Sequence, residues 1–182
     1  MVEFQVWLEA TLRSFTQVGL LMKQEWSWPI AESIHFIGLT LLFGSIVAWD
    51  LRLVGLARHV PIAAFHRLIP FAVLGFATNV ASGTFFLMTY PDQYVYNPAF
   101  HLKFLCLILA GVNVAVFYVT MFRHVNRLGP GAIGPTAARI NGAVSIVLWT
   151  VVIVAGRMIT FYRPSRCRAG QALGFLADCI VR

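Results

Sequence analysis

Four uncharged stretches, each long enough to cross a lipid bilayer, constrain the fold of this chain more than any other feature of its sequence. A transmembrane helix needs about 20 largely apolar residues in a row, and the uncharged cores are residues 33–49, 68–89, 104–122 and 140–156. The chain is 59% hydrophobic and only 12% charged, which is too apolar for a soluble domain. Short connections join helices that are antiparallel neighbours. We therefore expect an all-α fold in which residues 28–162 form an up-and-down bundle of four transmembrane helices.

The positive charge of the chain is concentrated in two of the connections between the predicted spans. The formal net charge is +7, and six arginines lie in or beside these connections: Arg52, Arg58, Arg67, Arg123, Arg127 and Arg139. The middle connection, YPDQYVYNP, contains neither lysine nor arginine. Short basic loops stay on the cytoplasmic side, and the two basic connections outweigh the four arginines of the C-terminal tail. We therefore expect a multi-pass protein of the bacterial inner (cytoplasmic) membrane, surrounded by lipid, with both termini periplasmic and no nucleic-acid partner.

The two ends of the chain are predicted to lie on the outer surface of the membrane. Residues 1–25 repeat apolar side chains at helical spacing, which indicates an amphipathic helix in the interface. Residues 163–182 form a C-terminal tail that contains Cys167 and Cys179. An oxidising periplasm allows a disulfide between them, although two cysteines alone do not establish a pairing.

Two histidines fall within the predicted spans, where an ionisable side chain is costly and commonly functional. His35 lies about 10 Å along the first span from Trp28, and His101 lies about 5 Å along the third span from Pro98. The first and third helices of an up-and-down bundle are diagonal and face each other across its core. We therefore predict one haem b between them, with both imidazoles as iron ligands and with Gly38 leaving room for the macrocycle. Two plainer interpretations stay open, in which His35 hydrogen-bonds a neighbouring helix and His101 is hydrated at the interface.

Four further basic side chains have predicted roles near a haem or at the membrane surface. Arg157 lies at about the depth of His35, and its guanidinium suits a haem propionate; pairing with an acidic side chain or extension to the surface are its alternatives. Lys103 is expected to extend to the interface. His66 opens the second span and His124 closes the third, so they are candidates for a second, inner haem site. An interfacial location beside arginines also accounts for both histidines.

Three segments carry a resemblance to known proteins: ESIHFIGLTLLFGSIVAWDLRLVGL, GFATNVASGTFFL and YNPAFHLKFLCLILAGVNVAVFY. They resemble a family of bacterial four-helix membrane proteins of uncharacterised function, which is distantly similar to the copper-resistance protein D membrane domain and to four-helix b-type cytochromes. The resemblance covers about residues 28–160 and implies the four-span fold and a haem. His35 matches the family's histidine in the first span, and Lys103 matches its lysine at the start of the third. The family's third span often ends with a histidine where this chain has Tyr118, which argues against an inner ligand there.

Several functions are compatible with these patterns. They favour a membrane b-type cytochrome that passes electrons between the quinone pool and a periplasmic redox partner on the outer face. The alternative is a cofactor-free accessory subunit of a larger membrane complex. His35 and Lys103 in a four-helix membrane fold also resemble the bacterial membrane-bound protoporphyrinogen oxidase, which implies haem-dependent oxidation of a porphyrinogen. Copper handling is disfavoured because the methionines are scattered over both sides of the membrane, and without a recognisable catalytic motif the assignment as an enzyme stays open.

Overall fold

The computed structural model describes residues 1–168, 171 and 174–181, and these residues form nine helices. The short helices are α1 (Val2–Arg13), α2 (Thr16–Met22), α4 (Ile62–His66), α6 (Pro91–Val95) and α8 (Phe122–Val125). The long helices are α3 (Ser27–Val54), α5 (Ile69–Thr89), α7 (Pro98–Thr120) and α9 (Thr136–Met158). Helices α3, α7 and α9, and the stretch that contains α4 and α5, are long and apolar enough to cross a membrane. The predicted all-α fold with four helices of transmembrane length is therefore confirmed, and the chain has the build of a multi-pass membrane protein.

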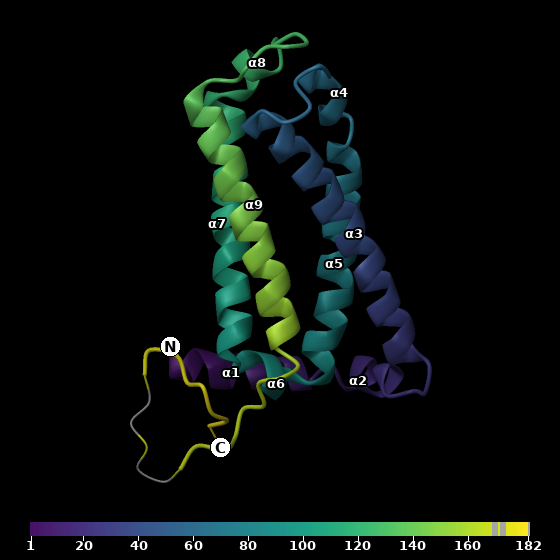
Figure 1. Cartoon of the computed structure of the whole chain (residues 1–182). Coiled ribbons are helices and arrows are strands. Elements are labelled where there is room, and N and C mark those ends of the chain that lie inside the picture. The colour runs from purple at the N-terminus through teal and green to yellow at the C-terminus, as the bar shows by residue number, and fades with distance from the viewer. Residues whose placement is uncertain (169–170, 172–173, 182) are drawn as a thin grey trace.

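The four long helices are arranged as two closely packed pairs. Figure 1 shows α3 beside α5 and α7 beside α9, and α3 also packs against α9. Helices α4 and α8 lie at one end of the molecule, whereas α1, α2, α6 and the described part of the C-terminal tail lie at the other. We call these the inner and the outer end, after the orientation predicted from charge. The basic connections are thus at the opposite end from both termini.

Glycine allows the backbones of α3 and α5 to approach closely. A Cβ atom at Gly75 would lie 2.5 Å from the carbonyl oxygen of Gly38 and 2.6 Å from the amide nitrogen of Leu42. Small residues commonly mediate such contacts between transmembrane helices, because van der Waals packing rather than the hydrophobic effect drives their association. The contact between Gly38 and Gly75 therefore sets the spacing and register of this pair.

Amide side chains join the second pair. The Asn141 Nδ2 atom donates to Asn113 Oδ1 at 2.8 Å and to the Asn113 carbonyl at 3.1 Å, and Asn113 Nδ2 donates to the Asn141 carbonyl at 3.2 Å. Such reciprocal hydrogen bonds satisfy polar groups that lipid cannot solvate. They hold α7 and α9 together within the apolar layer.

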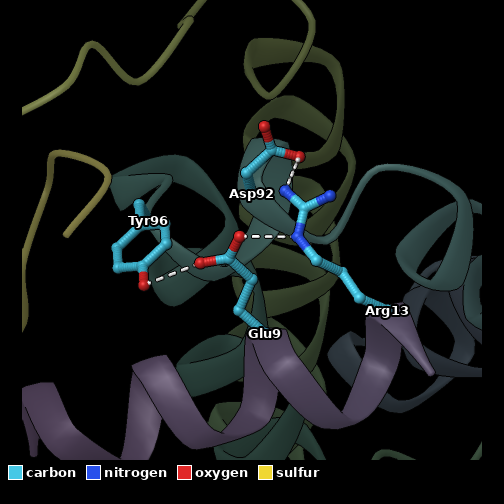
Figure 2. A network of polar contacts seen from close by, with 4 residues as sticks. All are labelled: Glu9, Arg13, Asp92 and Tyr96. Carbon is cyan, nitrogen blue, oxygen red and sulfur yellow. Dashed lines mark hydrogen bonds and ion pairs between the residues drawn. The ribbon is translucent and has the colours of Figure 1, made fainter. Parts of the chain in front are cut away.

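A polar network attaches α1 to the outer end of the bundle. Glu9 is only 5% exposed, and its carboxylate accepts from Arg13 Nε at 2.8 Å and from the Tyr96 hydroxyl at 3.0 Å. Arg13 also reaches Asp92 on α6, with 3.5 Å between the Nη2 and Oδ1 atoms (Figure 2). These contacts orient the polar face of α1 toward the protein and leave the apolar Phe4 and Trp7 side chains exposed.

The C-terminal tail closes over the same end. A disulfide joins Cys167 to Cys179, so the pairing that the sequence left open is made. Gln5 of α1 donates from Nε2 to the Ala177 carbonyl at 3.1 Å and accepts from the Ala177 amide at 2.8 Å. The disulfide therefore links two parts of the tail, and the hydrogen bonds with Gln5 attach the tail to α1.

The N-terminal region differs from the single helix expected over residues 1–25. It contains α1 and α2, and Ser14 and Phe15 interrupt the helix between them. The buried side chains of α1 are Gln5, Glu9 and Leu12, which face α6 and the tail. Contacts with the protein, and not only the apolar periodicity, therefore determine the course of this segment.

Candidate functional site

His35 lies on α3 and faces α5 in the outer half of the bundle. Its Nδ1 atom is 2.8 Å from the Ser82 hydroxyl oxygen, and its ring lies 5.6 Å from that of Phe86. The Ser82 hydroxyl donates to the Thr78 carbonyl at 2.7 Å, so its one proton is already used. Nδ1–H of the imidazole must therefore be the donor to Ser82. This tautomer leaves the lone pair of Nε2 free to accept a hydrogen bond or to bind a metal.

Lys103 lies on α7, two residues after His101. It is half-buried at the contact with α9, where a Cβ atom on Gly156 would lie 3.5 Å from the Lys103 Nζ atom. The absence of a side chain at Gly156 leaves room there for the ammonium group, and the extension of Lys103 to the interface stays a prediction.

His101 points to a backbone carbonyl near the outer end. Its Nε2–H donates to the Val95 oxygen at 2.8 Å, which ties the first turn of α7 to the end of α6. The bond occupies Nε2 and leaves Nδ1 as the nitrogen with a free lone pair. The structure thus gives His101 a local structural role at the start of α7.

Gly38 and Arg157 also have surroundings that differ from those expected. A Cβ atom at Gly38 would meet Asn79 Nδ2 at 2.8 Å and Thr78 at 3.0 Å, so α5 fills the space that the sequence assigned to a macrocycle. Arg157 is exposed, and its guanidinium carbon lies 5.3 Å from the centre of the Phe161 ring. Gly38 therefore serves the packing of α3 on α5, and Arg157 serves the outer surface of α9.

The two inner histidines differ in their surroundings. His66 Nε2 lies 3.1 Å from the Tyr118 hydroxyl of α7, among the rings of Trp49 and Phe122. His124 is exposed on α8. The structure therefore places a phenol, and not the second imidazole, beside His66.

Sequence reasoning identified His35 but missed most of its surroundings. Ser82 has the sequence signature of any polar residue within a span, which more often indicates a contact between helices than a site. Gly83 and Gly156 carry no signal beyond their small size, yet a Cβ atom at Gly83 would lie 3.9 Å from His35 Cε1. Only the rotation of each helix about its axis brings these groups to one place.

The comparisons with known proteins give a family but no activity. A family model described as a family of unknown function (DUF6644) matches residues 18–162. No curated protein and no solved structure matches the chain. The matched region contains the four long helices, and with them His35, Ser82 and Lys103.

Proposed function

The chain belongs to DUF6644, a family of unknown function, and from the groups around His35 we propose that it is a membrane b-type cytochrome. It transfers electrons between the quinone pool and a periplasmic redox partner on the outer face. One haem b is held in the outer half of an up-and-down four-helix bundle. When bound, a haem supplies a centre that takes up and releases single electrons, with a potential tuned by its ligands and surroundings.

The hydrogen bond from His35 Nδ1 to Ser82 carries this proposal. Metal-ligating histidines nearly always donate their other ring N–H to a neighbouring acceptor, which sets the tautomer and the orientation of the ring. Ser82 is such an acceptor at 2.8 Å, and its own proton is held by Thr78. The donor set at His35 therefore fits an iron ligand through Nε2.

Lys103 replaces Arg157 in the proposed site. A haem carries two propionates, and a lysine ammonium binds such groups as a point charge. Lys103 is half-buried, with its Nζ atom 3.5 Å from a Cβ built at Gly156, whereas Arg157 lies exposed over Phe161. Lys103 is thus the cation that holds a propionate, and its loss is expected to weaken haem binding more than the loss of Arg157.

Whether a second histidine ligates the haem iron distinguishes two candidate functions. A bis-histidine haem site would need a second imidazole, and His101 could supply it only through Nδ1 or by releasing the Val95 carbonyl. With His35 as the only histidine ligand, a bound haem would keep a position for another molecule. The engaged Nε2 of His101 thus favours the second candidate, an oxidase of the protoporphyrinogen oxidase type, in which the Lys103 ammonium would bind a carboxylate of the substrate.

Charge and cysteine chemistry support the proposed orientation in the bacterial inner membrane. The basic connections lie at the end with α4 and α8, and such loops remain cytoplasmic. The Cys167–Cys179 disulfide lies in the tail at the opposite end, and disulfides persist in the oxidising periplasm. Both termini are therefore periplasmic, and the exposed apolar side chains of α1 and α2 lie in the outer interface.

The test is an optical spectrum of the purified protein, oxidised and reduced, with haem quantified per chain. We expect haem in the wild type, its loss in His35→Ala, and a Ser82→Ala variant with about 10- to 100-fold weaker haem affinity, as for other partners of metal-binding histidines. His59→Ala is the control, because His59 is exposed in the α3–α4 connection. A low-spin spectrum that becomes high-spin in His101→Ala supports the cytochrome, and a high-spin wild type supports the oxidase. A colourless protein, expressed with haem supplied, refutes both and favours the accessory subunit.

A further inference from the structure

We propose that His66 and Tyr118, with the aromatic rings around them, bind the head group of a membrane quinone at the inner end of the bundle. The inference rests on the proposed function, because it locates the quinone that the cytochrome uses. It concerns binding only, at a place remote from His35.

The residues of this place come from four helices. His66 ends α4, Tyr118 lies in the last turn of α7, Trp49 lies on α3 and Phe122 begins α8. The His66 ring lies 4.9 Å from Phe122, 5.5 Å from Trp49 and 6.2 Å from Tyr118, measured between ring centres. One hydrogen-bonding pair is thus set within an aromatic enclosure, which we call the inner aromatic site.

The chemistry of the inner aromatic site matches that of a quinone. A quinone is a planar ring with two carbonyl oxygens that accept hydrogen bonds, and its reduced form has two hydroxyl groups that donate them. The imidazole of His66 and the phenol of Tyr118 can each donate or accept, so one pair serves both redox forms. The partly buried ring of Phe122 offers offset-stacked or edge-on contacts to the ring of the ligand, whereas Trp49, which is 6% exposed, supports His66 from the core.

Access to the inner aromatic site is from the lipid. Tyr118 is 37% exposed and the adjacent Val119 is 85% exposed, on a helix of transmembrane length. Helix α7 packs mainly on α9, and α5 packs mainly on α3. A ligand that arrives here comes through the bilayer, and a quinone with an apolar isoprenoid tail is suited to that route.

The inner aromatic site is separate from the proposed haem site. Trp49 follows His35 by fourteen residues on one helix, which corresponds to about 21 Å at 1.5 Å per residue. Loss of haem therefore need not affect quinone binding, and the two proposals are independently testable.

The experiment is a titration of the full chain in lipid nanodiscs with a benzoquinone that carries one isoprenoid unit, followed by tryptophan fluorescence. We expect saturable quenching that is lost in Trp49→Phe, because Trp49 is the tryptophan beside His66. Tyr118→Phe keeps the ring contacts but removes one hydrogen-bonding group, so we expect about tenfold weaker binding. His66→Ala is expected to weaken binding further. His124→Ala is the matched control, since His124 is exposed on the adjacent α8.

The outcomes separate the two proposals. Absence of saturable quenching in the wild type overturns the quinone site, as does equal binding by Tyr118→Phe, His124→Ala and the wild type. Quenching that persists in His35→Ala supports the inner aromatic site as an independent element. A wild type that binds quinone but no haem retains the site and refutes the cytochrome, whereas haem without saturable quenching refutes the site alone.

Discussion

The close approach of α3 and α5 leads to a sharp prediction for Gly75→Ala. The added methyl group would lie 2.5 Å from the Gly38 oxygen and 2.6 Å from the Leu42 nitrogen, and both are backbone atoms that cannot rotate away. Ordinary contacts of a Cβ atom begin at 3.4 Å, so the two helices must separate by about 0.9 Å. Overpacking of this kind typically costs about 1–3 kcal/mol.

The same substitution at an open position has the opposite sign. Gly44 and Gly111 have no atom within 4 Å of a built Cβ, so alanine there is expected to stabilise the helix by up to about 1 kcal/mol. Gly75→Ala should therefore be about 1–4 kcal/mol less stable than Gly44→Ala. Gly142→Ala should fall between them, because its Cβ would meet the Asp50 oxygen and Leu53 Cβ at 3.1 Å.

The assay is equilibrium unfolding in mixed micelles with increasing SDS, followed by far-UV circular dichroism. Because the separation also moves His35 away from Ser82, haem occupancy of Gly75→Ala is expected to fall in parallel. If Gly75→Ala is as stable as Gly44→Ala, then α3 and α5 do not touch as the structure has them, and the position of Ser82 beside His35 loses its basis.

Two further predictions concern the outer end of the molecule. Cys106 is buried in α7, and the other two cysteines are joined by a disulfide. A thiol-reactive polymer should therefore modify Cys167 and Cys179 of the native protein only after reduction. Modification of either residue without a reductant would exclude the disulfide. Burial, and next the charge of Glu32, raise the pKa of Tyr94 to about 12, so the folded state holds the phenolic proton more tightly than the unfolded state, whose pKa is about 10. Stability should therefore fall as the pH rises from about 10 to 12, and Tyr94→Phe should flatten this part of the profile in a pH series of melting temperatures; an unchanged slope would contradict the burial of Tyr94.

The sequence by itself determined the class of the fold. Aspartate, glutamate, lysine and arginine are absent from four largely apolar stretches of about transmembrane length, and this indicates four membrane-spanning helices. It also singled out His35, because an imidazole within such a stretch is costly. These conclusions depend only on composition along the chain, and they are independent of how the helices pack against one another.

The tertiary structure decided which side chains meet. A span that is apolar on all sides carries no periodic signal for its inward face, so sequence could not show that His35 turns to Ser82 or that His101 turns to the Val95 carbonyl. The rotation and spacing of each helix follow from local contacts such as Gly38 against Gly75. Close packing between helices therefore determines which residues far apart in the chain come into contact, and this packing exists only in the folded structure.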